Sequence, residues 1–478
     1  MDFSELFPEE NENAFLEDEE IKKRIDKCRE YVASSLTFAF IEYIEETVRL
    51  CIDYDFVNEG IELIDALLEV ASYNSEYWLY KGMLLNNIFD FEEAYSCFSQ
   101  AASLNPNDVE VLINKSIAEE NVGLFSEALE SLTKATEIEP DNIEALFGLG
   151  VLYERKDDYT NAIHYLNRVV ELDEEHSEAW YEMGYCYEAL DEFKSALAAY
   201  DKYLDLEPYS STGWYNKGIV LLRMGNYEQA ADTFEMSIAI NDEFSSSWFN
   251  AGVAYANMDR LKKALKYFKK AAKLDPDDES IHFNIGQVYD DLGDLDKAIY
   301  YYSYAIRLDA DYIDAYFSRG KCYHKAKDYI SALEDLESVI ALKTDHLDAW
   351  MLKAEIENEL MHFDEAVNSY IAVVNLDPEN FKANFQLAEC LINLGRFEEA
   401  KAYYSKCLRF KKDHANSFYG IAKANFLLNK KEEAYTSLLK AISIDPRYKE
   451  KISEDLPFFG SFSISGNVNK SDSLNNEK

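Results

Sequence analysis

A repeat with a period of 34 residues organises most of this 478-residue chain. One position of the period holds alanine without a break from Ala94 to Ala434. A second position holds only small residues from Gly82 to Ala422, and the prolines between 106 and 446 are separated by multiples of 34. Because self-similarity at such a period is the signature of stacked supersecondary units, we expect one repeat array and not three ordinary domains.

Each period contains the apolar pattern of two helices joined by a short polar break. Trp180, Gly184 and Tyr187 share one helix face, since residues three and four apart lie on the same side of an α-helix. A second stripe begins at Phe193 and continues through Ala196. The small residues of the two stripes allow the helices to approach closely, so each period predicts a helical hairpin.

These residues resemble the tetratricopeptide repeat (TPR), which has the pattern W-x3-G-x2-Y, then A-x3-F/Y, then P. One unit shows all of it, at Trp248, Gly252, Tyr255, Ala264, Phe268 and Pro276. The resemblance implies an all-α, right-handed superhelical solenoid of about twelve helical hairpins with short helical caps. His282 and Asn384 depart from the pattern, because they stand where most units have a large apolar residue.

The register of the repeat predicts the domain organisation. Residues 1–40 form an acidic N-terminal segment with a capping helix, and 41–448 form the repeat array. Within the array, 41–74 is a degenerate first repeat and eleven repeats of 34 residues follow. Residues 449–459 are expected to cap the C-terminal end, and 460–478 read as a disordered tail rich in Ser and Asn.

Charge limits the kinds of partner. The net charge is −44, which removes the usual electrostatic driving force for binding nucleic acid. Residues 1–240 carry 52 acidic and 16 basic side chains, against 39 and 31 in residues 241–478. The first half therefore either presents a solvated acidic surface or recruits a basic segment of a partner.

Cysteine use and hydropathy favour a cytoplasmic protein. The seven cysteines are widely spaced, and no two form a C-x-x-C pair. We therefore expect neither a disulfide framework nor a metal site. The N-terminus lacks the features of a signal peptide, and no window approaches 18 uninterrupted apolar residues, so membrane insertion is not expected.

An aromatic stripe and an asparagine row are the candidate binding residues. In the TPR fold, the residue after the large apolar position points toward the inner surface. That stripe reads Phe147, Tyr181, Tyr215, Phe249, Phe283 and Phe317. The next position holds Asn216, Asn250 and Asn284, whose carboxamides can donate to and accept from a peptide backbone. Aromatic residues at helical spacing are also common packing residues, so both roles stay open.

Lys321 and Lys325 lie on a first helix and are candidates to anchor a carboxylate. No lysine occupies the aromatic-stripe position of any unit, which disfavours the carboxylate clamp of TPR co-chaperones.

No catalytic or cofactor-binding pattern stands out. The function we expect is a non-enzymatic scaffold that binds an extended peptide or a partner protein in a concave groove. The alternative is a regulatory or accessory subunit of an enzyme encoded on another chain.

Overall fold

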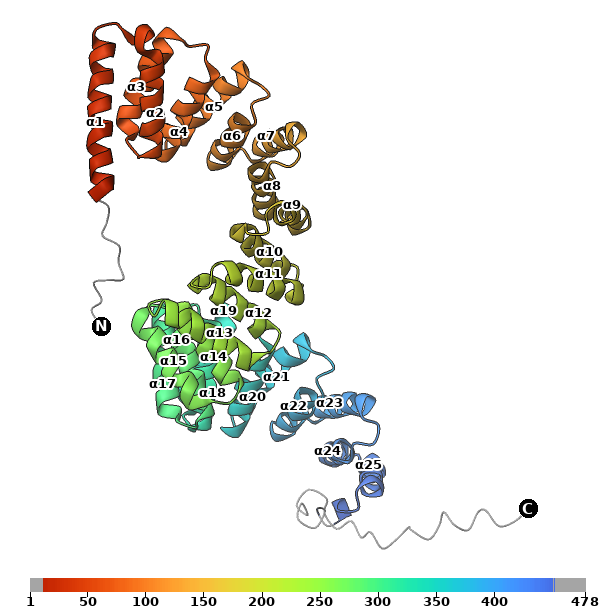
Figure 1. Cartoon of the computed structure of the whole chain (residues 1–478). Coiled ribbons are helices and arrows are strands. Elements are labelled where there is room, and N and C mark those ends of the chain that lie inside the picture. Colours follow the sequence, from red (N-terminus) through yellow and green to blue (C-terminus); the bar gives the residue numbers. More distant parts are fainter. Residues whose placement is uncertain (1–11, 450, 452–478) are drawn as a thin grey trace, which may run out of the picture. The chain divides into compact units, whose positions relative to one another are not determined.

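The computed structural model describes residues 12–449 and residue 451, and every regular element among them is a helix (Figure 1). The chain divides into two compact units, Met1–Asp242 and Glu243–Lys478. The all-α class and the paired helical hairpins predicted from the 34-residue period are confirmed. The handedness, the number of repeats and the domain boundaries stay predictions.

The first unit begins with α1 (Glu12–Ala33) and the short 3-10 helix η2 (Thr37–Phe40). Helix pairs follow, and the two helices of each pair contact one another. They are α2 (Ile41–Asp53), α3 (Val57–Val70), α4 (Ser75–Asn87), α5 (Phe91–Leu104), α6 (Val109–Asn121), α7 (Phe125–Ile138), α8 (Ile143–Arg155), α9 (Tyr159–Leu172), α10 (Ser177–Ala189), α11 (Phe193–Leu206), α12 (Ser211–Arg223) and α13 (Tyr227–Ile240).

The second unit continues the same pairing. Its helices are α14 (Ser245–Asn257), α15 (Leu261–Leu274), α16 (Glu279–Asp291), α17 (Leu295–Leu308), α18 (Ile313–Lys325), α19 (Tyr329–Leu342), α20 (Leu347–Glu359), α21 (Phe363–Leu376), α22 (Phe381–Asn393), α23 (Phe397–Phe410), α24 (Ala415–Leu427) and α25 (Lys431–Ile444). We call the even-numbered helix of each pair the first helix and the odd-numbered one the second helix.

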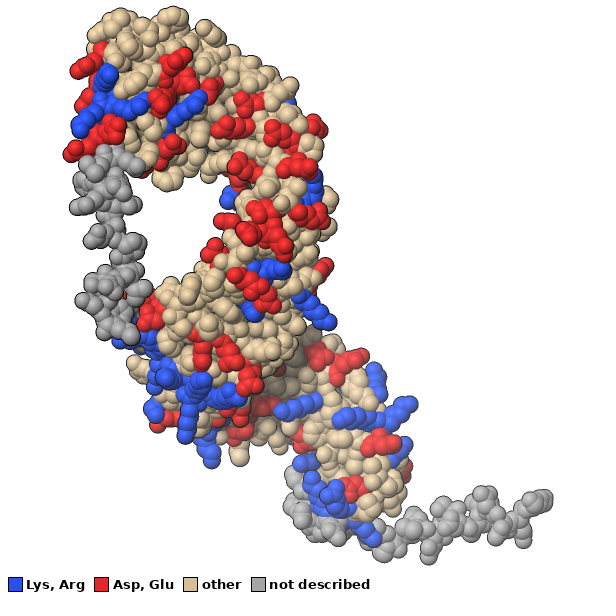
Figure 2. Space-filling view, in the orientation of Figure 1, with Lys and Arg blue, Asp and Glu red and all other residues tan. Residues whose placement is uncertain are grey.

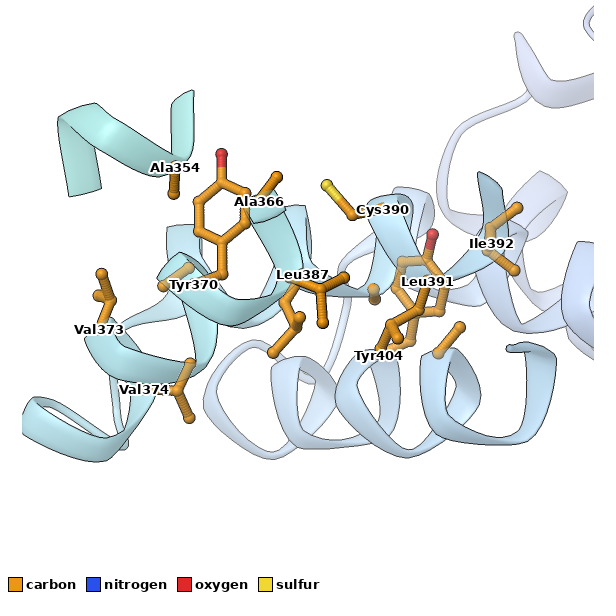
Figure 3. Packing of buried hydrophobic residues seen from close by; sticks show 14 of the residues in the cluster. Ala354, Ala366, Tyr370, Val373, Val374, Leu387, Cys390, Leu391, Ile392 and Tyr404 are labelled. Carbon is orange, nitrogen blue, oxygen red and sulfur yellow. The ribbon is translucent and has the colours of Figure 1, made fainter. Parts of the chain in front are cut away.

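The small residues of the repeat lie where the two helices of a pair meet. A Cβ added at Gly252 would lie 2.7 Å from the Phe268 ring, which is too close for a real contact. The core is therefore a series of layers in which the large side chains of one helix fill the gap left on the next. Figure 3 shows Tyr370, Leu387 and Tyr404 within one such layer of α20–α23.

A recurring hydrogen bond explains the two departures from the TPR pattern. The indole Nε1 of Trp180 donates to the carbonyl oxygen of Glu174, six residues earlier, at 3.0 Å. His282 Nε2 lies 2.9 Å from the corresponding carbonyl of Pro276, and Asn384 Nδ2 donates to that of Pro378 at 3.1 Å. In these units a side-chain N–H thus satisfies a loop carbonyl, and His282 is a packing residue.

The turn between the two helices repeats as regularly as the helices themselves. Every turn from residue 55 to residue 429 has one residue with positive φ, and these residues are spaced by 34. Glycine, which adopts this conformation without strain, fills four of these positions. Phe89 and Met361 adopt φ of 62° at two others, so these two turns carry backbone strain.

The termini differ in what the structure describes. Ile21, Ile25 and Cys28 of α1 are buried in one core cluster with residues of α2 and α3. Most of the predicted C-terminal cap (449–459) and all of the predicted tail (460–478) lie outside the described residues. All seven cysteines are described, and each is a buried free thiol. Among the described helices, none is long and apolar enough to cross a membrane.

Candidate functional site

The predicted binding residues lie on successive first helices. The aromatic stripe places Phe147 on α8, Tyr181 on α10, Tyr215 on α12, Phe249 on α14, Phe283 on α16 and Phe317 on α18. All six side chains are half-buried. We call the exposed face of the first helices within one unit the first-helix face of that unit.

Most of the aromatic stripe packs against the repeat's own second helix. The Tyr181 ring centroid is 5.1 Å from that of Tyr203, and the Phe249 centroid is 5.7 Å from that of Phe268. Phe317 instead lies 4.9 Å from the ring of His346, in the loop that follows the second helix. These rings stabilise the hairpins through edge and tilted contacts, so only their exposed edges remain for a ligand.

The asparagine row is partly engaged within the helices. Asn250 Nδ2 donates to the Ser246 carbonyl at 3.0 Å, and Asn284 Nδ2 donates to the Ser280 carbonyl at 2.8 Å. Asn216 Nδ2 differs, because it donates to the Tyr181 hydroxyl of the preceding repeat at 2.9 Å. Each of these bonds uses one of the two amide hydrogens and holds the carboxamide in a fixed orientation.

The two predicted lysines have different surroundings. Lys325 Nζ lies 2.6 Å from Asp290 Oδ1 of the preceding repeat, so its charge is already paired. Lys321 Nζ lies 5.6 Å from the centroid of the Phe317 ring, and no ion pair of this lysine occurs among the described residues. Of the two, Lys321 is therefore the one whose charge is available to a ligand.

A pocket of about 350 Å³ opens on the first-helix face of the second unit, among α14, α16 and α18. It brings together Asn284 and Lys321 from the predicted set with Gln287, Asp291 and Ser318. Phe268 and Tyr302 from the second helices also line it. The pocket thus offers amide, carboxylate, hydroxyl and ammonium groups beside aromatic surface, which suits a polar segment of a peptide.

Sequence reasoning missed Gln287 and Asp291, although a simple signal was present. They follow Asn284 by three and seven residues and therefore lie on the same helix face. They lie outside the two rows next to the large apolar residue, on which the sequence-based prediction rests.

Ion pairs between neighbouring repeats are a second feature of the first-helix faces. Glu120 on α6 pairs with Arg155 on α8. Glu188 on α10 lies 3.3 Å from Arg223 on α12, measured between the carboxylate and guanidinium groups. The pair of Asp290 with Lys325 has the same geometry in the second unit. In each pair the base follows the acid by 35 residues, one more than the period, so a search at a spacing of 34 does not detect them.

The first-helix face of the first unit is acidic, and acidic side chains dominate the part of this unit seen in Figure 2. Its first helices carry a row of glutamates at their second residues, which are Glu76, Glu110, Glu144 and Glu178. Burial raises the pKa of Glu110, and the charges of Asp108, Glu144 and Glu76 raise it further. Carboxylates on this face therefore repel one another and would be stabilised by an external cation.

Metal binding and thiol reactivity find little support among the described residues. Within the described part of the chain, no group of three or more His, Cys, Asp or Glu side chains is placed to hold a metal ion. Burial raises the pKa of the Cys51 thiol and of the Cys186 thiol, each to about 12, which leaves them unreactive near neutral pH.

Family models match repeat after repeat of the chain. Models described as tetratricopeptide or TPR repeat match residues 75–108, 245–278, 267–300, 288–327, 313–346, 359–417 and 415–448. A model described as anaphase-promoting complex, cyclosome, subunit 3 matches residues 121–203 and 156–237. With the paired helices and the 34-residue register, these matches show that the chain belongs to the TPR family. Members of this family are in general non-catalytic scaffolds that bind protein or peptide partners.

Solved structures with similar helical arrays include a MamA protein, which is 27% identical to this chain with a TM-score of 0.34. That alignment covers 35% of this chain and 92% of the MamA chain. YrrB, described as a TPR protein with an unusual peptide-binding site, is 26% identical over 39% of this chain and 97% of its own, with a TM-score of 0.35.

A TPR protein from Parabacteroides merdae is 16% identical over 52% of this chain and 98% of its own, with a TM-score of 0.39. No curated protein matches the chain. The family assignment therefore rests on the repeat models and on the hairpins themselves.

Proposed function

We propose that this protein is a scaffold that holds an extended segment of a partner protein along its first-helix faces, in the concave groove of a TPR superhelix. The pocket among α14, α16 and α18 is the observation that carries the proposal. It joins two predicted residues, Asn284 and Lys321, to further polar groups on one accessible surface. Asn250 and the exposed ring edges of Phe249 and Phe283 would extend the contact along neighbouring repeats.

The acidic first unit favours partners with a basic segment, and the same charge disfavours nucleic acid. Seven free thiols suit a reducing compartment, so we place the protein in the cytoplasm. We propose no catalytic residue, because a scaffold needs positioned binding groups and not an activated nucleophile.

Paired substitutions with a matched control test the proposal. We expect Asn250→Ala with Asn284→Ala to weaken capture of partner proteins from native lysate by at least about tenfold, since each removes a carboxamide from the first-helix face. Asn368→Ala with Asn375→Ala removes two exposed carboxamides from the second helix α21 and should leave capture unchanged. Equal capture by both variants would contradict the assignment of this face, and circular dichroism would confirm that both are folded.

The same purification separates the alternative function. A regulatory or accessory subunit would bring down one enzyme in a fixed stoichiometry, and loss of that complex would change the activity of the enzyme. A scaffold for extended segments would instead retain partners that share a short linear sequence.

A further inference from the structure

The ion pairs between neighbouring repeats are interrupted at one place on the first-helix face of the first unit. Glu154 on α8 occupies the same repeat position as Glu120 and Glu188, both of which pair with an arginine 35 residues later. The residue 35 positions after Glu154 is Ala189. Glu154 therefore lacks the neighbouring base that its counterparts have.

A second carboxyl group faces Glu154 where a cation would be expected. Glu182 on α10 is hydrogen-bonded to Glu154, and burial, together with the charge of Glu154, raises the pKa of Glu182 to about 8. Arg155, the nearest cation acting on Glu182, is already paired with Glu120. Glu182 thus keeps its proton beside a second carboxyl group, which is the usual outcome when like charges meet without a cation.

A buried hydroxyl on the second helix of the same repeat, α11, is also left without a partner. The ring of Tyr200 lies against Gly184 of α10, where an added Cβ would be 2.8 Å from Cζ. Tyr200 has no exposed surface, and its hydroxyl makes no hydrogen bond among the described residues. The acidic groups that act on this hydroxyl most strongly are Glu188, Tyr181 and Glu182. An orphaned buried hydroxyl is rare in folded proteins, so it is an independent sign that the polar network here is incomplete.

An exposed aromatic ring lies on the same helix face as Glu182. Tyr185 lies three residues after Glu182 on the same face of α10, and 43% of its side chain is exposed. The methylene stem of a long basic side chain packs well on such a ring, and its charged end gains a cation–π contact. Arginine suits the site better than lysine, because its planar fork matches a carboxylate and stacks on tyrosine.

We propose that Glu154 and Glu182 form a recognition site for a basic side chain, arginine by preference, from an extended segment of a partner protein. This inference rests on the proposed scaffold function and deepens it by naming a contact and its chemistry. The arriving guanidinium takes the place that Arg155 and Arg223 occupy in the neighbouring pairs. The proton held by Glu182 leaves to solvent as the cation binds.

Fluorescence anisotropy with the full chain tests the proposal. The probes are a labelled Ala-Arg-Ala-Arg-Ala peptide and the same peptide with neutral citrulline in place of arginine. We expect the arginine peptide to bind at least about tenfold more tightly than the citrulline peptide, as for desolvated charge pairs at interfaces. Absence of binding by the arginine peptide, or equal binding of both peptides, would overturn the proposal.

Two variants locate the site, each with a matched control. Glu154→Gln with Glu182→Gln removes both carboxylates, and Ala189→Arg supplies the missing base from within the chain. Each should lower the affinity for the arginine peptide about tenfold or more. As controls, Glu171→Gln with Glu175→Gln removes two exposed carboxylates elsewhere, and Ala189→Gln adds bulk without charge. The affinity of both controls for the arginine peptide should stay within about twofold of the wild-type affinity. Equal weakening by site variants and controls would show that net charge, and not this site, attracts the peptide.

The result is separable from the test of the scaffold function. Asn368→Ala with Asn375→Ala, on the second helix α21, lies outside both sites and should leave binding of the arginine peptide unchanged. If partner capture depends on Asn250 and Asn284 but the arginine peptide fails to bind, only the present inference falls. If the peptide binds as expected but the Asn250 and Asn284 substitutions do not change partner capture, the cation site is supported and the assignment of the binding face in the second unit is contradicted.

Discussion

The first-helix faces of the two units differ at one repeat position in how an acid is paired. In the first unit, Glu154 and Glu182 meet as two acids with no base of their own. In the second unit, the acids of the corresponding region have bases close by, as in the pair of Asp290 with Lys325. The same hairpin fold therefore carries one position where two acids meet without a base of their own and equivalent positions where acid and base are paired, so the fold alone does not determine binding.

A buried carboxylate of the second unit contrasts with Glu182. Arg319 on α18 donates to both carboxylate oxygens of Asp335 on α19, at 2.9 and 2.6 Å, and Asp335 is 3% exposed. Arg319 also donates to the Ser303 hydroxyl at 2.9 Å. A carboxylate in the second unit is thus part of the stabilising network, whereas Glu182 in the first unit opposes its neighbour.

Removing the buried carboxylate of Asp335 should have the largest effect on stability. Asp335→Ala leaves the Arg319 charge buried beside Ser303 alone, and we expect a loss of about 3 kcal/mol in the free energy of unfolding. Urea denaturation monitored by circular dichroism measures it. Glu334→Ala, at the exposed neighbouring residue, should change the free energy by less than about 0.5 kcal/mol. Similar effects of the two substitutions would contradict the contrast between the units.

Removing a carboxylate from the first unit should have the opposite sign. The pKa of Glu182 is raised from its ordinary 4.5 to about 8, so between these values the folded state binds a proton that the unfolded state releases. Stability should therefore fall as the pH rises from about 4.5 to about 8. The other titratable or charged groups that interact with this carboxyl are Glu154, Arg155, Tyr181, Cys186 and Tyr200.

Glu182→Gln should remove this part of the pH dependence, and the variant should be more stable than the wild type above about pH 8. Denaturation midpoints across the pH range, measured for both proteins, give the comparison. Parallel curves would show that Glu182 titrates normally.

A smaller gain is expected when the interrupted row of ion pairs is completed. Ala189→Arg places a guanidinium where Arg223 stands relative to Glu188, and an exposed pair of this kind contributes up to about 1 kcal/mol. Ala189→Gln is the control of similar size without charge. A destabilised arginine variant would mean that the geometry of the neighbouring pairs is not reproduced at this repeat.

The smallest effect should be the same in both units. Phe89 in the first unit and Met361 in the second hold positive φ at equivalent turns. We expect Phe89→Gly and Met361→Gly each to stabilise the chain by about 0.5 kcal/mol, because glycine adopts this conformation without a Cβ clash. Thermal unfolding measures both. Clearly different shifts in the unfolding temperature would show that the two units differ in their turns as well as in their surface charges.

The sequence predicts the frame well because each repeat buries the same face in the same way. The spacing of 34 placed the hairpins, and the replacement of tryptophan by His282 or Asn384 proved compatible with the frame because each keeps the hydrogen bond to the preceding loop. The site was harder to predict, since it depends on contacts between repeats. Lys325 looked free in the sequence but is paired with Asp290, 35 residues earlier. The interruption at Glu154 likewise becomes visible only after the intact pairs are known from the structure.

Proton release on binding tests the central claim most directly. Calorimetric titration of the wild type with the arginine peptide at pH 7, in two buffers of different ionisation enthalpy, gives the number of protons released. If a basic side chain replaces the proton held by Glu182, close to one proton should leave per peptide bound, and none should leave from Glu182→Gln. Binding without proton release in the wild type would show that the peptide docks elsewhere and would contradict the account.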